Sequence, residues 1–178
     1  TNLVISQGTV KNRSESLIVV NPNSVLNILG YTRFENATVT NENRGGMITV
    51  FGQMGEEGAL YGVVNISGTG VVFSGNSSIN GGAIYVGSYG ILNTEADDKD
   101  GISFGKTKDE YKENTASGNG GAIFAQENAQ ITLKNVWFKE NAASVGGAIY
   151  ISADCKSNIS DCTFSGNTAT GSSLGGGA

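Results

Sequence analysis

A glycine pair followed by alternating apolar residues recurs along this chain and constrains its fold more than any other feature. The clear copies are Gly81-Gly82-Ala83-Ile84-Tyr85-Val86, Gly120-Gly121-Ala122-Ile123-Phe124-Ala125 and Gly146-Gly147-Ala148-Ile149-Tyr150-Ile151; Gly45-Gly46-Met47-Ile48-Thr49-Val50 is looser, and Gly176-Gly177-Ala178 begins another. Successive pairs start 36, 39, 26 and 30 residues apart. That interval is the span of one unit in a solenoid.

A second motif, an aromatic residue followed three positions later by asparagine, precedes the glycine pairs. Its copies are Phe73-Ser74-Gly75-Asn76, Tyr111-Lys112-Glu113-Asn114, Phe138-Lys139-Glu140-Asn141 and Phe164-Ser165-Gly166-Asn167, with Phe34-Glu35-Asn36 as an imperfect first member. Asparagine tolerates sharp backbone bends, and its amide can bond the same residue one repeat away. The motif therefore predicts a ladder of Asn76, Asn114, Asn141 and Asn167.

The repeat at residues 129–151 has the least insertion and shows the unit most clearly. Ile131 and Leu133 alternate with polar neighbours, Val136 and Phe138 do the same, and residues 149–151 close the unit. Such alternation predicts short strands, three to a repeat. We therefore expect an all-β parallel β-helix with side loops, in which coils stack about 4.8 Å apart.

The repeats predict one domain over residues 1–178, as a segment of a longer chain. We expect an irregular first coil at about 1–25 and repeats at about 26–50, 63–86, 102–125, 129–151 and 152–178. Inserted loops are predicted at about 51–62 and 87–101, where the repeat pattern lapses.

The alternation also predicts which side chains face the core. After each glycine pair Ile48, Ile84, Ile123 and Ile149 share one parity and are expected inside, whereas Tyr85, Phe124 and Tyr150 share the other and are expected outside. An aromatic core stack is expected from Phe34, Phe73, Tyr111, Phe138 and Phe164, although Asp109 breaks the apolar pattern beside Tyr111. Glycine is needed where the backbone turns left-handed or approaches another coil closely. We assign that role to Gly81, Gly82, Gly120, Gly121, Gly146 and Gly147.

The composition argues against several classes of partner. The formal charge is −5, and no lysine or arginine cluster is present, so we expect no nucleic-acid partner. No apolar run reaches membrane-spanning length, so this segment is not expected to insert into a membrane. Histidine is absent and Cys155 and Cys162 fit no metal framework, so we expect no metal and no cofactor. The two cysteines could bridge a turn within one coil, although Cys162 has the parity of a buried residue.

Catalysis is considered because many parallel β-helices degrade polysaccharides. A glycoside hydrolase needs two carboxylates at a defined separation on one face. Here the acidic residues cluster in the expected loops and the basic residues are scattered, so we expect no catalytic residues and no enzymatic activity.

The paired Gly-Gly-Ala-Ile and Phe-x-x-Asn motifs over roughly residues 34–178 resemble those of the chlamydial polymorphic membrane proteins. The resemblance implies a right-handed β-helix passenger of an autotransporter, displayed on the bacterial outer membrane and used for adhesion to host cells. It also implies adhesive roles for residues 81–84, 120–123 and 146–149 and for the Phe-x-x-Asn segments. Similar repeats occur in large surface proteins of other organisms, so the motifs indicate an architecture more firmly than a receptor.

Two groups of residues are candidate ligand sites. Tyr85, Phe124 and Tyr150 are expected to form an exposed aromatic stripe able to stack on sugar rings, unless a loop covers them or the parity is reversed. Acidic residues in the two expected loops, which should emerge close together, form the second group: Glu56, Glu57, Asp97 and Asp98. The segment Asp97-Asp98-Lys99-Asp100-Gly101 resembles a calcium loop, but the first ligand position falls on Ala96.

Together these features predict a segment of an extracellular, non-enzymatic cell-surface adhesin. Its expected partner is a receptor or glycan of a host or neighbouring cell. The alternatives are a structural module that self-associates end to end into a fibre and a polysaccharide-degrading β-helix enzyme.

Overall fold

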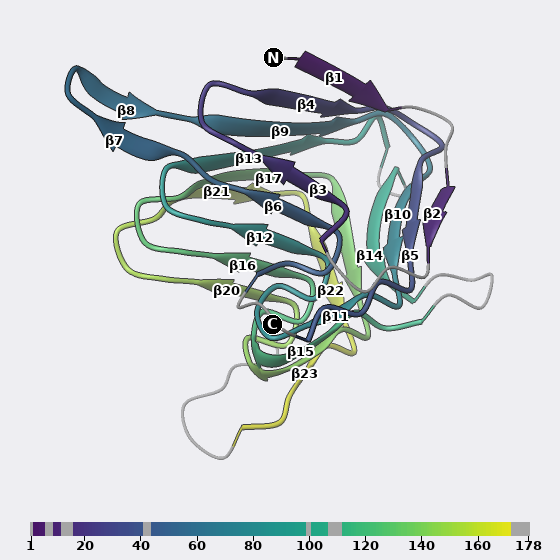
Figure 1. The fold of residues 1–178 in the computed structure, drawn as a ribbon. Coiled ribbons are helices and arrows are strands. Elements are labelled where there is room, and N and C mark those ends of the chain that lie inside the picture. Colours follow the sequence, from purple (N-terminus) through teal and green to yellow (C-terminus); the bar gives the residue numbers. More distant parts are fainter. Residues whose placement is uncertain are drawn as a thin grey trace.

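The computed structural model describes residues 2–5, 9–11, 16–40, 44–98, 101–106 and 112–171. These residues form strands and turns, and helix is absent from them (Figure 1). Consequently the described part of the chain contains no helix that is long and apolar enough to cross a membrane. The all-β prediction is confirmed.

Four parallel sheets contain nearly all the strands. Sheet 1 consists of β1 (Asn2–Ile5), β4 (Val25–Ile28), β9 (Gly62–Ser67), β13 (Gly90–Glu95), β17 (Gln130–Lys134) and β21 (Lys156–Ser160). Sheet 2 consists of β2 (Thr9–Lys11), β5 (Arg33–Glu35), β10 (Val71–Ser74), β14 (Ile102–Gly105), β18 (Val136–Lys139) and β22 (Thr163–Ser165). Sheet 3 consists of β11 (Ser77–Ser78), β15 (Thr115–Asn119), β19 (Ala142–Val145) and β23 (Thr168–Ala169). Sheet 4 consists of β3 (Ile18–Val20), β6 (Ile48–Val50), β12 (Ile84–Val86), β16 (Ile123–Ala125) and β20 (Ile149–Ile151).

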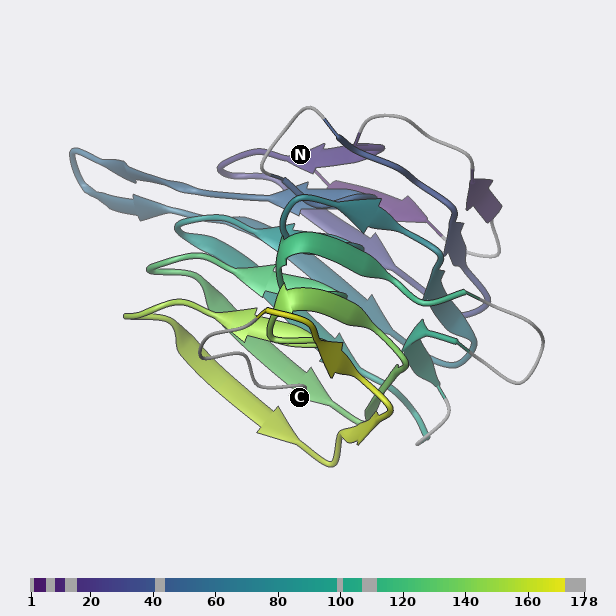
Figure 2. The same ribbon diagram turned by 90° about the horizontal axis from the view of Figure 1, so that it is seen from below.

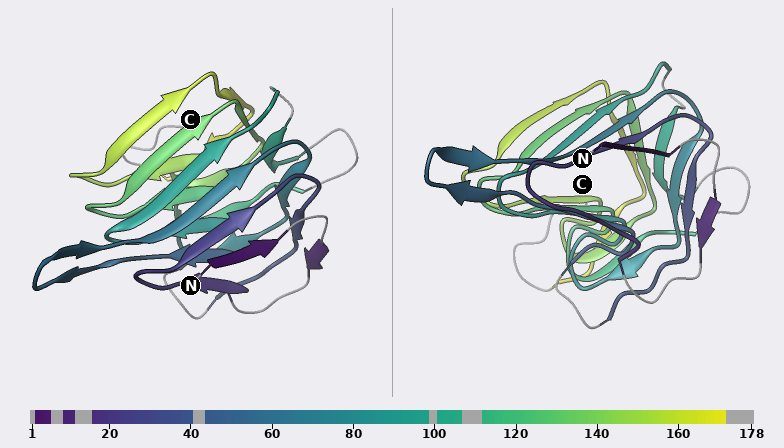
Figure 3. Two further views of the ribbon diagram at one scale, coloured as in Figure 1. Left: turned by 90° about the horizontal axis from the view of Figure 1, so that it is seen from above. Right: turned by 45° about the horizontal axis from the view of Figure 1, so that its top comes forward.

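The chain visits the sheets in the same order in each repeat. From β9 to β12 it passes through sheets 1, 2, 3 and 4, and β13 then returns to sheet 1 beside β9. Strands of successive repeats lie one beneath another in every sheet (Figures 2 and 3). This succession of parallel strands is consistent with a β-helix.

Each full repeat contains four strands, so the predicted three were one too few. The missed strand of the clearest repeat is β19, whose sequence Ala-Ala-Ser-Val has no large apolar residue at alternate positions. Its single buried residue, Ala143, is small. The strand is held by its backbone pairing with β15 and β23, which the side-chain pattern does not reveal.

The predicted inserted loop at 87–101 is wrong in its middle, because β13 occupies six of its fifteen residues. Residues Gly90–Glu95 pair with β9 on one side and β17 on the other, and Leu92 and Thr94 point into the core. The buried positions of this strand include Gly90 and Thr94, so the sequence does not show the alternation of apolar and polar residues that marks a strand. The other predicted insertion, 51–62, contains an antiparallel hairpin of β7 (Gln53–Gly55) and β8 (Gly58–Leu60) that projects from the stack (Figure 1).

A stack of phenylalanines runs through the core beneath sheet 2. Phe34, Phe73, Phe104, Phe138 and Phe164 lie on successive strands with ring centroids 4.7, 4.7, 5.1 and 4.9 Å apart and nearly parallel planes. The member from the third repeat is Phe104, not Tyr111 as predicted; Tyr111 lies outside the described residues. An insertion after β14 separates Phe104 from Asn114, and the spacing of the motif therefore pointed to the wrong aromatic residue.

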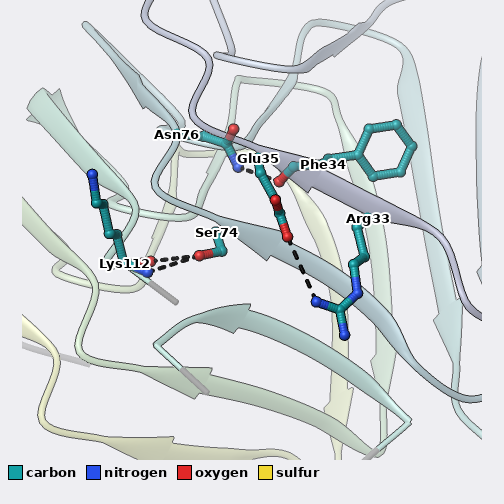
Figure 4. A network of polar contacts seen from close by, with 6 residues as sticks. All are labelled: Arg33, Phe34, Glu35, Ser74, Asn76 and Lys112. Atoms are coloured by element: carbon teal, nitrogen blue, oxygen red, sulfur yellow. Dashed lines mark hydrogen bonds and ion pairs between the residues drawn. The ribbon is translucent and has the colours of Figure 1, made fainter. Parts of the chain in front are cut away.

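The predicted asparagine ladder is present beside the phenylalanine stack. The Nδ2 of Asn76 donates to Asn114 Oδ1 at 3.0 Å, that of Asn114 to Asn141 Oδ1 at 3.0 Å, and that of Asn141 to Asn167 Oδ1 at 2.9 Å. Each Nδ2 also donates to a phenylalanine carbonyl of the preceding coil, such as Phe34 for Asn76 (Figure 4). In the first repeat Ala37, not Asn36, takes the ladder position, and its N–H donates to Asn76 Oδ1.

The glycine pairs have two different backbone roles. The first glycine of each of the three clear pairs is left-handed, with φ of 64° at Gly81, 66° at Gly120 and 63° at Gly146. The second glycine packs against the next coil: a Cβ on Gly82 or Gly121 would lie 2.2 or 2.0 Å from the carbonyl oxygen of the second glycine one coil on, and one on Gly147 would lie 2.6 Å from the Thr168 backbone. The pair therefore turns the chain while allowing coils to stack closely.

Candidate functional site

The outer side of sheet 4 carries a stripe of stacked aromatic rings. Tyr85, Phe124 and Tyr150 occupy the same register position on β12, β16 and β20. Their ring centroids are 5.0 and 5.4 Å apart, with interplanar angles of 23° and 5°. The flanking isoleucines Ile84, Ile123 and Ile149 are buried, so the alternation across this sheet has the predicted sense.

The stripe is less open than the sequence suggests. Phe124 is only 8% exposed because Tyr85 and Tyr150 cover its two faces, whereas the two tyrosines are half-buried. Rings stacked on one another offer a partner mainly their edges and hydroxyls. A complete ring face can remain only at the two ends of the stripe.

At one end of the stripe the stack stops at a small residue. Thr49 holds the register position beside Tyr85 on β6, and it is 1% exposed. A cavity of about 240 Å³ opens there, lined by Arg44, Thr49, Phe51, Gly52, Tyr85, Gly87, Ser88 and Gln126. A hollow of the described surface thus lies beside the last ring of the stripe.

Polar groups of three successive coils converge on this cavity. The Tyr85 hydroxyl donates to Gln126 Oε1 at 2.8 Å, and the Ser88 N–H reaches the same oxygen at 3.4 Å. The Arg44 guanidinium lies over the Phe51 ring, 5.7 Å from its centroid. The cavity therefore combines aromatic walls with a positive charge, an amide and a hydroxyl, which is the usual make-up of a small-molecule site.

We expect the Tyr85 phenol to ionise at a higher pH than an ordinary tyrosine. Burial raises the pKa of its phenol above the ordinary 10.0, and the positive charge of Arg44 offsets part of that rise. Because the fold favours the neutral phenol, its contribution to stability is complete below pH 10 and is lost as pH rises through the folded-state pKa. The difference in tyrosinate absorbance between the wild type and Tyr85→Phe should show a tyrosine ionising above 10.0. Ionisation of that tyrosine at or below its ordinary value would contradict the assignment.

The two acidic groups do not come together as predicted. Glu56 and Glu57 form the exposed turn of the β7–β8 hairpin, which leads into the first residue of β9. Asp97 and Asp98 are exposed after the last residue of the neighbouring β13. Because β9 and β13 are parallel and in register, the two groups lie at opposite ends of sheet 1. The missed strand β13 is the reason for the error.

The remaining candidate sites offer little chemistry. Among the described residues no group of three or more His, Cys, Asp or Glu side chains is placed to hold a metal ion. Cys155 and Cys162 are free thiols at opposite ends of the five-residue β21, too far apart to bridge at about 3.3 Å per residue. Burial is the largest influence on both thiols, and it raises their pKa.

Two segments of the chain match the model of a known repeat family. Residues 70–87 and 112–126 match the model of the Chlamydia polymorphic membrane protein repeat. The chain carries polymorphic membrane protein repeats. The first match spans β10 to β12, and the second runs from two residues before Asn114 through the glycine pair to the residue after β16. Comparison with curated proteins and with solved structures gave no match.

The motif residues and the cavity residues of this chain overlap at only a few positions. Glycines, isoleucines, phenylalanines and asparagines of the motif turn the chain or fill the core, whereas the cavity lies between coils on the outer face. Arg44, Phe51 and Gln126 escaped sequence reasoning because they lie in turns between strands. Thr49 and Tyr85 belong to both sets, because they hold the same position in two copies of the motif, and only Tyr85 was a predicted site residue.

Proposed function

We propose that this chain is part of a right-handed parallel β-helix displayed on a bacterial surface, where it acts as a non-enzymatic adhesin. The polymorphic membrane protein repeats support a location at the outer membrane or cell surface. The proposed partner is a receptor or glycan on a host or neighbouring cell. The single observation that carries the binding role is the cavity at the end of the Tyr85–Phe124–Tyr150 stripe.

The geometry supports binding because the site is built on a rigid scaffold. Each ring of the stripe belongs to a strand that is paired within the sheet, so the rings lose little freedom when a partner docks. The cavity adds an arginine and two aromatic walls, residue types that dominate the energetics of protein interfaces.

Adhesion should depend on the tyrosines of the stripe. Beads coated with the segment are expected to bind host cells, and Tyr85→Ser with Tyr150→Ser should reduce bead binding by about tenfold or more. Tyr31→Ser is the matched control, because Tyr31 is 68% exposed and lies after β4, away from sheet 4. Circular dichroism must show that both variants keep the wild-type spectrum.

If the folded double variant bound cells as well as the wild type, the aromatic stripe would not be the adhesive surface. The two other functions give different results in the same preparation. A fibre module would form filaments visible by electron microscopy, and a polysaccharide-degrading enzyme would release reducing ends from acidic or neutral polysaccharides.

A further inference from the structure

The aromatic stripe has one vacant position, and its neighbours define what could fill it. In the register of sheet 4, Tyr85 lies between Phe124 on one coil and Thr49 on the next. Phe124 covers one face of the Tyr85 ring at a centroid distance of 5.0 Å. The other face is turned toward the shorter Thr49 side chain, where the cavity opens. A ring-shaped group placed there would continue the stack by one step.

The size of the cavity limits the ligand to about one ring. At about 240 Å³ it is smaller than the pockets of roughly 300–1,000 Å³ that hold drug-sized molecules. One wall is the Tyr85 ring, and Phe51 provides a second aromatic side chain. A pyranose ring suits such a wall, because its C–H groups pack against an aromatic face while its hydroxyls point outward to polar partners.

The charge of the lining favours an acidic ligand. Among the lining residues that the structure describes, Arg44 is the one ionised side chain, since none of the others is Asp, Glu or Lys. A guanidinium matches a carboxylate in a bidentate pair and has five N–H donors, so it can serve a ligand in addition to the partners it already has. The Gln126 amide and the Ser88 hydroxyl can bond sugar hydroxyls.

We propose that this cavity binds a saccharide unit that carries a carboxylate, such as a hexuronate. Its ring packs on the open face of Tyr85 and its carboxylate pairs with Arg44. The proposal rests on the proposed adhesin function and specifies the class of glycan that the surface would recognise.

Titration of the purified 178-residue chain with glucuronate, glucose and acetate tests the proposal by NMR or calorimetry. Glucuronate should bind at least about tenfold more tightly than either of the others, because glucose lacks the charge and acetate lacks the ring. Equal binding of acetate and glucuronate would show that the sugar ring contributes nothing to binding and would overturn the proposal. Equal binding of glucose and glucuronate would show that the pairing of the carboxylate with Arg44 contributes nothing to binding, which would also overturn the proposal.

Two substitutions probe the site from different sides. Arg44→Gln should lower the affinity for glucuronate by about tenfold or more and leave the weak binding of glucose within about twofold. Thr49→Tyr should abolish glucuronate binding by placing a fourth ring in the vacant position, with a thermal melting temperature no lower than that of the wild type. Tyr31→Ser, remote from the cavity, should bind like the wild type. Retained binding in Thr49→Tyr would overturn the proposal.

The glycan proposal and the adhesin proposal can fail separately. A segment that binds cells through the stripe but ignores glucuronate would overturn the glycan proposal alone. A segment that binds glucuronate in the cavity but does not attach to cells would overturn the adhesin and leave the cavity as a saccharide site.

Discussion

Gly121→Ala is expected to be the most damaging single substitution in this chain. A Cβ at this position would lie 2.0 Å from the Gly147 carbonyl oxygen and 2.7 Å from both the N and the O of Ala142. All three atoms are backbone of the adjoining coil, so no side chain can rotate away to make room. The coils would have to separate locally and break the pairing of their strands. We expect a loss of unfolding free energy on the order of 5 kcal/mol, measured by urea denaturation followed by circular dichroism.

Gly55→Ala provides the control for this effect. Gly55 lies in the projecting hairpin, where the nearest atom to an added Cβ is the Gly58 carbonyl oxygen at 3.1 Å and the others belong to the Leu60 side chain. We expect a change within about 1 kcal/mol. Similar losses in the two variants would mean that glycine matters here for chain flexibility and not for the close approach of coils.

Asn141→Ala should cause the second large loss of stability, because it strands several buried polar groups at once. The Asn141 amide donates to Phe104 O at 3.0 Å and to Asn167 Oδ1 at 2.9 Å, and its oxygen accepts from Asn114 Nδ2 at 3.0 Å and Asn114 N at 3.4 Å. Asn114 and Asn141 are fully buried, so water does not replace the lost partners. Each stranded group costs about 1–3 kcal/mol, and we expect a total loss of about 3 kcal/mol or more.

A second ladder in the same molecule separates burial from hydrogen bonding. Asn65 Nδ2 donates to Asn27 Oδ1 at 2.9 Å, and Asn65 Oδ1 accepts from Asn93 at 3.0 Å, but these three residues are half-buried on sheet 1. Water can reach their amides, so Asn65→Ala should cost about 1 kcal/mol or less. Chemical denaturation of both variants decides the point, and equal losses would show that desolvation is not what makes the inner ladder important.

The sequence predicts the inward-facing residues of this fold well, because large apolar side chains repeat at fixed distances from a glycine pair. Ile84 and Ile123 are buried, as their alternation indicates. Phe73 and Phe138 likewise belong to the core stack, in which each packs against Phe104. Prediction fails where a strand lacks such side chains. β19 is made of small residues, and β13 opens on glycine and places Thr94 in the core. Both strands are therefore specified by backbone pairing with their neighbours.

The candidate site was only partly predictable for a different reason. Tyr85 was found because it belongs to the repeat, but the cavity beside it arises because Thr49 is small where the following coils have rings. Arg44 and Gln126 reach the cavity from turns of different coils, 82 residues apart in sequence. Alternation along strands does not determine which turn residues become neighbours across coils.

The separation of Phe104 from Asn114 also shows how such a chain can diverge. Two residues lie between Phe73 and Asn76 and nine lie between Phe104 and Asn114, yet both pairs occupy equivalent positions in the phenylalanine and asparagine ladders. Peptide length at this corner is therefore independent of the internal geometry. Relatives should gain or lose segments there without disturbing the scaffold, and they will align correctly only when the buried rungs, not the intervals between motifs, are matched.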